Sequence, residues 1–268
     1  MRGHRLSVSG SALALSCLLL AACEDKNAAL EAAAAKASAA PAPKPAPPPV
    51  KEVEPVEPEV VKKKEPRVCK PGKVVDFAGD AVMEAQIRLK TAKKDGDVTV
   101  ADLAKVKSLN LSQAKVDELD PCIFPHLTNL KELFLGPGKL DDLSPIADLK
   151  NLESLRASLN RVENLKPLEK LVKMDRLDLG HTKVTDLSPL ANLTAMTELQ
   201  LDDTPVSDLK PLSACTKLER LSLQRTQVKD LSPLKPLTSL KFLYLAGDNI
   251  DDMSVLGPLR GHGLKVEE

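Results

Sequence analysis

The C-terminal half of this chain repeats with a fixed period of 22 residues. A leucine returns six times at the same point of one phrase, and residues 177–196, LDLGHTKVTDLSPLANLTAM, represent that phrase well. A constant period of this length is typical of a solenoid, in which each repeat buries its apolar face against its neighbours. We therefore expect an α/β fold built from stacked coils rather than one globular core. The repeated leucines are Leu133, Leu155, Leu177, Leu199, Leu221 and Leu243.

Each repeat divides into a strand and a turn. The Leu-x-Leu phrase alternates inward leucines with one outward residue, which predicts a strand of a parallel sheet on a concave face. The Asp-Leu-Ser-Pro phrase places polar capping residues before a proline, which is typical of the start of a short helical or 3₁₀ turn, here on the convex face. In one repeat Ala157 replaces a core leucine, which is a weak point unless Leu159 compensates. A polar column suited to bonding the turns of neighbouring coils comprises Asn160, Thr182, Thr204 and Thr226.

A different pattern precedes the repeats. Within residues 76–90, Val82, Ala85 and Leu89 recur at helical spacing, and Asp80 suits the N-cap. Residues 98–100 predict a short strand, and residues 101–106 predict a helical turn. We expect residues 67–107 to form a small helical cap that covers the open end of about seven repeats in residues 108–268.

The order of this cap and the first repeat, DFAGDAVMEAQIR followed by VTVADLAKVKSLNLS, is similar to that of internalin-like bacterial leucine-rich repeat proteins. With the cap, the resemblance covers most of residues 74–266. It implies a leucine-rich repeat solenoid, and it permits a role as an adhesin. Many proteins share this fold and bind unrelated partners, so the resemblance does not name a partner.

The N-terminus has the pattern of an export signal. Arg2 and Arg5 precede an apolar run over residues 11–20, which is too short to span a bilayer. The run ends in Leu-Ala-Ala-Cys, which resembles a bacterial lipobox and implies cleavage after residue 22 and lipid attachment at Cys23. The alternative is a plain secretory peptide. Glu24 follows the cysteine where an Asp would resemble an inner-membrane retention signal, so we expect an outer-membrane lipid anchor, with the domain periplasmic or surface-exposed.

Residues 23–66 predict a disordered tether between the lipid and the folded domain. Residues 28–40 are rich in alanine, and residues 41–66 are rich in proline and charge. A proline-rich chain is extended, at about 3.1 Å per residue, so this part alone could reach on the order of 80 Å. The tether would hold the folded domain away from the membrane. A PxxP ligand at Pro55 and Pro58 is a less favoured reading.

Composition and the remaining cysteines exclude several classes of site. Lys and Arg number 38 and Asp and Glu 38, and no segment has the basic bias of a nucleic-acid binder. Export permits disulfides, and Cys69 beside the cap and Cys122 in the first repeat are the candidate pair, with two free thiols as the alternative. Cys215 aligns with a core leucine and is expected to be buried. The histidines are dispersed, so we expect no metal site and no cofactor.

No nucleophile elbow, phosphate-binding glycine loop or metalloprotease motif is present, so we expect no enzyme. The carboxylate pairs at residues 141–142, 202–203 and 251–252 are interpreted as turn chemistry. A weak calcium site over residues 248–252 is conceivable, although the spacing is not that of an EF-hand.

Function is expected at the outward positions of the sheet, which have no role in the core. Aromatic and arginine side chains dominate protein–protein hot spots, and both recur at these positions. Alternatively, Phe242 and Tyr244 only cover the terminal coil, and Phe134 only covers the inserted residues near Cys122. The predicted partner-binding residues are Phe134, Arg156, Arg176, Asp178, Glu198, Gln200, Arg220, Phe242 and Tyr244.

The sequence thus predicts a monomeric, non-enzymatic envelope lipoprotein that presents a leucine-rich repeat surface to a protein partner. One alternative is a structural envelope component that binds peptidoglycan or a surface polysaccharide. Another is an internalin-like adhesin.

Overall fold

A computed structural model describes residues 67–69 and 72–268 of the chain. The predicted signal peptide, the lipidated Cys23 and the tether lie outside the described residues. Within the described part, one continuous apolar core runs from Phe77 in the cap to Leu264 in the last coil.

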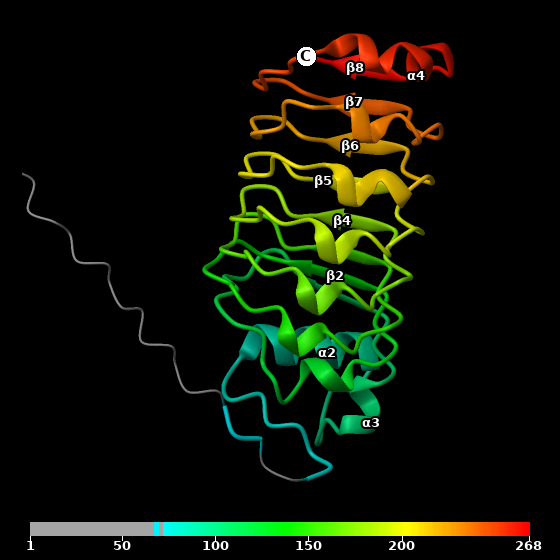
Figure 1. Cartoon of the computed structure of the whole chain (residues 1–268). Coiled ribbons are helices and arrows are strands. Elements are labelled where there is room, and N and C mark those ends of the chain that lie inside the picture. Colours follow the sequence, from blue (N-terminus) through cyan, green and yellow to red (C-terminus); the bar gives the residue numbers. More distant parts are fainter. Residues whose placement is uncertain (1–66, 70–71) are drawn as a thin grey trace, which may run out of the picture. The chain divides into compact units, whose positions relative to one another are not determined.

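The described unit is a stack of coils joined by one parallel sheet (Figure 1). Its eight strands lie in chain order, and each pairs with the next in parallel. Leu109 pairs with Leu133, and from there the predicted column of leucines stays in register to Leu243, which pairs with Val266. The α/β solenoid expected from the period is therefore confirmed. The strands are β1 Ser108–Leu111, β2 Glu132–Leu135, β3 Ser154–Arg156, β4 Arg176–Asp178, β5 Glu198–Gln200, β6 Arg220–Ser222, β7 Phe242–Tyr244 and β8 Lys265–Glu267.

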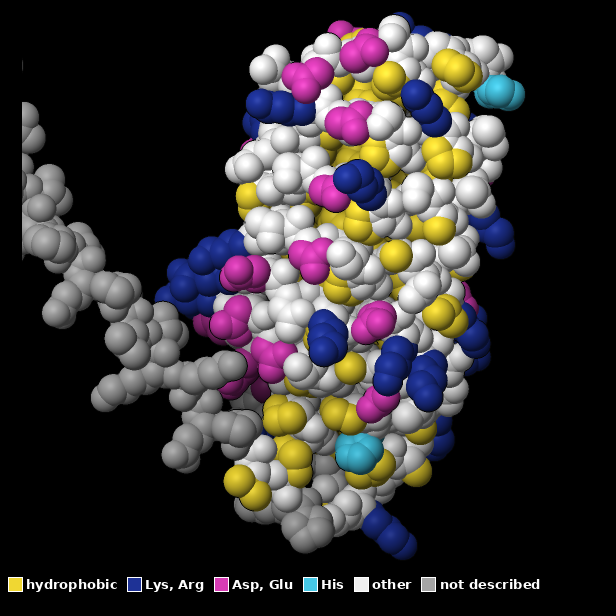
Figure 2. Space-filling view, in the orientation of Figure 1, with side chains coloured by type: hydrophobic (Ala, Val, Ile, Leu, Met, Phe, Trp, Pro, Cys, Tyr) yellow, Lys and Arg dark blue, Asp and Glu magenta, His cyan; other side chains and the backbone are white. Residues whose placement is uncertain are grey.

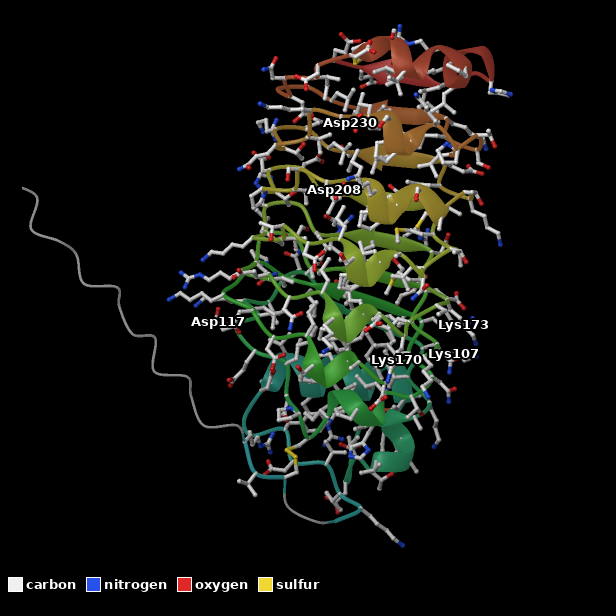
Figure 3. The ribbon with its side chains drawn as sticks, viewed as in Figure 1. Lys107, Asp117, Lys170, Lys173, Asp208 and Asp230 are labelled. Atoms are coloured by element: carbon white, nitrogen blue, oxygen red, sulfur yellow. A yellow bond between two sulfur atoms is a disulfide. The ribbon has the colours of Figure 1, made fainter. Side chains whose placement is uncertain are left out.

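A column of 3₁₀ turns forms the side that faces the viewer in Figures 1 and 2, where hydrophobic side chains gather along the middle. Before each regular turn, the side-chain oxygen of an Asp or Asn accepts a hydrogen bond from the backbone N–H of the residue two positions later. Asp208 accepts from Lys210 N at 2.9 Å, and Asp230 accepts from Ser232 N at 2.8 Å (Figure 3). The last turn forms in the same way without its proline, because Asp252 accepts from Ser254 at 2.8 Å. The turns are η1 Phe124–His126, η2 Ser144–Ile146, η3 Lys166–Leu168, η4 Ser188–Leu190, η5 Lys210–Ala214, η6 Ser232–Leu234 and η7 Met253–Leu256, followed by the short helix α4 Gly257–Gly261.

The polar column of the repeats is only partly the inter-coil ladder that its spacing predicts. The Asn160 side chain does join coils, since its Oδ1 accepts from Leu140 N at 3.2 Å and its Nδ2 donates to Gly136 O at 3.1 Å. Thr182 and Thr204 instead donate to carbonyls three residues earlier in their own coils. Thr226 does join coils, because its Oγ1 donates to Asp248 Oδ1 in the next coil at 3.0 Å.

Ala157 lies in the core, as its alignment predicts, but Leu159 does not compensate for it. Ala157 is fully buried, whereas the Leu159 side chain is 53% exposed. The reason lies in the backbone, because Leu159 adopts a left-handed conformation with φ of 59°, which turns its side chain outward.

The cap contains the helix α2 Ala81–Thr91 and the short helix α3 Val100–Leu103. Asp80 is the N-cap, as predicted, and accepts from Met83 N at 2.9 Å. The predicted apolar face is wrong: Met83 and Ile87 face the core, while Val82 and Leu89 are 47% and 70% exposed. The helix has two apolar stripes, and its packing against β1 buries the other one. The predicted strand at residues 98–100 reduces to one antiparallel bridge between Val74 and Thr99.

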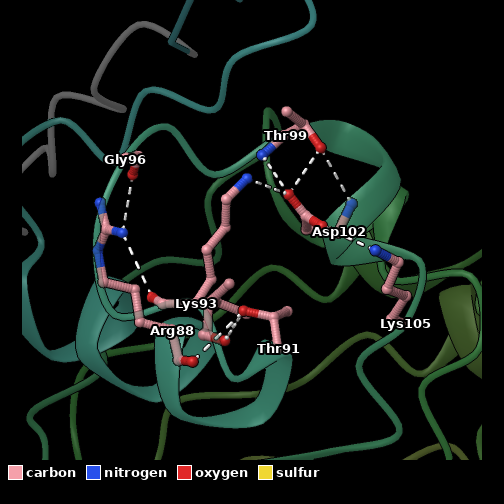
Figure 4. A network of polar contacts seen from close by, with 8 residues as sticks. Arg88, Thr91, Lys93, Gly96, Thr99, Asp102 and Lys105 are labelled. Carbon is pink, nitrogen blue, oxygen red and sulfur yellow. Dashed lines mark hydrogen bonds and ion pairs between the residues drawn. The ribbon is translucent and has the colours of Figure 1, made fainter.

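Asp102 joins the two helices of the cap (Figure 4). Its carboxylate accepts from Lys93 Nζ and Lys105 Nζ, each at 2.9 Å, and from Thr99 Oγ1 at 2.7 Å. The carboxylate also accepts from Thr99 N at 3.0 Å, and Thr99 Oγ1 accepts from Asp102 N at 3.3 Å, so the two residues form a capping box at the start of α3. These contacts, led by the Lys93 ammonium, hold the pKa of Asp102 far below its usual range, so the group is an ionised structural anchor.

A disulfide joins the start of the described chain to the first repeat. Cys69 and Cys122 are bonded, with their Cα atoms 5.3 Å apart. Next to it, the Arg67 guanidinium pairs with Asp120 and with Asp76, the latter at 3.1 Å. Cys215 is fully buried as predicted, and burial raises the pKa of its thiol.

Candidate interaction surface

All nine residues predicted for the sheet face lie on the outward side of the strands. Two columns carry them, and the strand register places each residue beside its counterparts in the neighbouring coils. Arg156, Arg176 and Arg220 are exposed, whereas the carboxylate, amide and aromatic members are partly buried between them. We call these nine residues, together with Glu132 and Lys265, the sheet face.

The first half of the sheet face is organised around Asp178. Its Oδ2 lies 3.0 Å from Arg156 Nε and accepts from Ser158 Oγ at 3.1 Å, while its Oδ1 accepts from Gly180 N at 3.1 Å. The Arg156 guanidinium also lies 5.9 Å from the centre of the Phe134 ring, which is within cation–π range. Asp178 and Phe134 therefore hold Arg156 in place.

Arg176, in the next coil, is held more loosely. Its nearest carboxylates, those of Glu132 and Asp175, are each 3.9 Å away. Beside it, Gln200 Nε2 donates to Glu198 Oε1 at 3.0 Å. Arg176 is thus held by longer ion pairs than Arg156 is.

The far end of the sheet face centres on Phe242. The Arg220 guanidinium lies 5.1 Å and the Lys265 ammonium 5.7 Å from the centre of its ring. Phe242 and Tyr244 are both partly exposed in β7, and β8 lies beyond them, so they do not close the end of the stack. This arrangement presents aromatic surface flanked by two cations. Sequence reasoning missed Lys265, because the last step of the register is one residue longer than the period.

A charged ladder that sequence reasoning also missed borders the sheet face. Asp203 binds Arg225 through a hydrogen bond of 2.7 Å to Nε and a second contact to the other guanidinium nitrogen, and its Oδ2 lies 3.4 Å from His181 Nε2. Arg225 holds the pKa of Asp203 below its usual range. All three residues have a positive φ, between 54° and 56°. Their 22-residue spacing is visible in the sequence, but the shared left-handed backbone that aims them outward is not.

The carboxylate pairs are structural, although not all as predicted. Asp142 and Asp252 accept backbone N–H groups at the start of turns. Asp202 acts across coils, because its Oδ1 accepts from Ser222 Oγ at 2.5 Å and from Gln224 N at 2.9 Å.

Among residues 67–69 and 72–268, no group of three or more His, Cys, Asp or Glu side chains is placed to hold a metal ion. Within the same ranges, no helix combines the length and the apolar character needed to cross a membrane.

Known proteins share both the repeats and the architecture. The family described as Leucine Rich repeats (2 copies) matches residues 150–192 and 216–258. Internalin C2 from Listeria monocytogenes is 28% identical, with a TM-score of 0.63 over 70% of this chain and 92% of its own. The described part of the chain is a leucine-rich repeat solenoid that is similar to internalins.

A second internalin from Listeria monocytogenes, InlF, is 26% identical to this leucine-rich repeat chain, with a TM-score of 0.57. The match covers 70% of this chain and 62% of InlF. A comparison with curated proteins finds no match. The similarity supports a protein-interaction role for the leucine-rich repeat scaffold.

Proposed function

We propose that this leucine-rich repeat protein is a non-enzymatic envelope lipoprotein that binds a protein partner through its sheet face. The observation that carries the proposal is the alternation of exposed arginines with half-buried aromatic and acidic residues across successive strands. Two of the three arginines stack on aromatic rings, so they are ordered before binding and lose less entropy on contact. The mixed charge suits a protein with patterned charge.

The lipoprotein part of the proposal rests on the sequence before the described residues. Cys23 would carry the acyl chains, and residues 24–66 would tether the repeats to the outer membrane. Replacing Cys23 by Ser should release the protein from the membrane fraction and abolish labelling with a fatty-acid analogue. A protein that stays membrane-bound and labelled after this change would contradict lipidation at Cys23.

Crosslinking followed by affinity capture tests the sheet face. Arg156→Ala/Arg176→Ala/Tyr244→Ala removes a held cation, a loosely held cation and an aromatic ring, and the set of captured proteins should lose its main member. The matched control is Lys170→Ala/Lys173→Ala, two exposed lysines that Figure 3 places away from the sheet-face strands. If the triple variant captures the same proteins as the wild type, the sheet face is not the binding site.

The orientation of the domain distinguishes the adhesin alternative from a periplasmic role. Protease treatment of intact cells should digest a surface-exposed domain and spare a periplasmic one. Protection in intact cells would exclude the adhesin alternative while leaving the binding of an envelope protein in place.

A further inference from the structure

We propose that an open recess at the margin of the first three coils binds an acidic sugar residue of a glycan. The recess has a volume of about 750 Å³, and its lining includes Lys115, Lys139, Arg161, Gln113 and Pro137. It lies in the loops that follow the strands, away from the residues that form the sheet face. The inference is therefore independent of the proposed protein partner.

The recess exists because two glycines bring neighbouring coils together. A Cβ atom at Gly136 would lie 1.8 Å from Ala114 O, and one at Gly138 would lie 1.9 Å from Val116 O, so no side chain fits at either position. In the next coil the position of Gly138 is occupied by Asn160, whose buried amide fills the turn. The Gly-Pro-Gly segment thus leaves a floor of backbone, Pro137 and Ala114 where later coils have larger side chains.

Three cations from successive coils surround this floor. The Arg161 N–H donates to Leu140 O at 2.8 Å, which places the Arg161 and Lys139 coils in contact, and adjacent coils in a sheet are about 4.8 Å apart. In the described part of the chain, the Lys139 and Arg161 side chains make no ion pair, and both are exposed. Lys and Arg side chains gather at the margin where Asp117 lies (Figures 2 and 3).

Asp117 faces the same region and sets its polarity. Its Oδ2 pairs with Lys115 Nζ at 2.7 Å and its Oδ1 accepts from Lys139 N at 2.9 Å. The hydrogen bond from Lys115 lowers the pKa of Asp117, so this carboxylate stays ionised and remains paired with the Lys115 ammonium. Lys139 and Arg161 are left for an incoming anion, and the planar guanidinium suits a carboxylate or phosphate in particular.

The surroundings favour a sugar over other anions. No aromatic side chain lines the recess within the described chain, so a nucleobase finds no stacking platform. Pro137 and Ala114 offer an apolar floor to the C–H face of a ring, while Ser112 and Gln113 offer hydrogen bonds to hydroxyls.

The test measures binding of a fluorescent oligogalacturonate to the purified protein by anisotropy, with a neutral maltooligosaccharide as the uncharged probe. We expect the acidic probe to bind and the neutral probe not to bind. Arg161→Ala and Lys139→Ala should each weaken binding by about tenfold, and Arg161→Lys should recover part of it. Lys170→Ala/Lys173→Ala removes two positive charges elsewhere, one more than either single variant, and should leave binding unchanged. Because Lys139 and Arg161 are exposed, thermal melting should confirm that these variants remain folded.

Four results would overturn the inference. The first is no binding of the acidic probe at low salt. A second is equal weakening by Lys170→Ala/Lys173→Ala, which would show a diffuse charge effect. Equally tight binding of an oligoglutamate peptide or of phosphatidylglycerol vesicles through Arg161 would assign the recess to an acidic protein or to a membrane instead.

Discussion

Asp248 occupies a position where an amide would serve better than a carboxylate. Its Oδ1 accepts from Thr226 N at 2.6 Å and from Thr226 Oγ1 at 3.0 Å. Its Oδ2 is buried without a hydrogen-bond partner among the described residues. In the same column, Asn160 Oδ1 accepts a backbone N–H and its Nδ2 donates to backbone carbonyls. We therefore predict that Asp248→Asn stabilises the fold.

The magnitude follows from two opposing changes. Satisfying an orphaned buried polar atom recovers about 2 kcal/mol, while converting bonds to a charged acceptor into neutral ones loses about 1 kcal/mol. The expected net gain is about 1 kcal/mol, or about 2–4 °C in melting temperature for a folded unit of this size.

The gain should depend on pH, with a definite sign. Burial raises the pKa of Asp248, and the neighbouring Asp202 adds to this, so the folded state binds the proton more tightly than the unfolded chain does. Below the unfolded pKa of about 3.9, Asp248 is protonated in both states and does not destabilise the fold. As the pH rises from there to the folded pKa, Asp248 increasingly lowers the free energy of unfolding. A protonated Asp248 can itself donate a hydrogen bond, as Asn does.

Urea unfolding at pH 7 and near pH 4 measures both effects. Asp248→Asn should raise the free energy of unfolding at pH 7 and show a smaller advantage near pH 4. The reverse change, Asn160→Asp, is the matched control and should destabilise by about 2 kcal/mol or more at pH 7, because it removes the buried amide donor. A destabilising Asp248→Asn, or an advantage independent of pH, would refute the reasoning.

Three further changes test other parts of the fold. Cys69→Ser/Cys122→Ser opens a loop with a sequence separation of 53 and should lower the free energy of unfolding by about 4 kcal/mol, measured in urea without reductant. Asp102→Asn should weaken the cap most at neutral pH. Because the pKa of Asp102 is depressed, its contribution to the stability of the cap is present above the unfolded pKa of about 3.9 and is lost as the pH falls. Amide hydrogen exchange of the cap, measured as the pH is lowered, should therefore show a weaker pH dependence of cap stability in the variant than in the wild type. Leu159→Gly should raise the free energy of unfolding by about 1 kcal/mol, because glycine adopts the left-handed backbone at φ 59° without the steric strain that a leucine side chain causes. Calorimetry measures the change, and no gain in stability would show that this strain is absent.

The repeat predicts the sheet register well because each coil places its leucines and its outward residues at the same positions. Once one Leu-x-Leu phrase is placed, every outward residue of β2 to β7 follows from the period. The predictions that failed depend on tertiary choices. Helix α2 has two apolar stripes, and only its packing against the first coil decides that Met83 and Ile87 face inward.

Backbone conformation limits the prediction at the margins. Leu159, His181, Asp203 and Arg225 all adopt the left-handed backbone conformation. His and Asp are enriched in this conformation but Leu and Arg are not, so residue type does not predict it for the whole column. The recess depends in the same way on close contact between two backbones at Gly136 and Gly138. These features need coordinates, because they arise from how one coil meets the next.

Photocrosslinking in cells tests the central claim, that the sheet face binds a protein partner. A photoreactive amino acid would replace Gln200, which is on the sheet face, or Ser188, which is exposed on the turn η4 of the neighbouring coil. If the sheet face binds a protein partner, we expect a discrete crosslinked protein adduct from position 200 and none from position 188. An adduct from position 188 alone would contradict it.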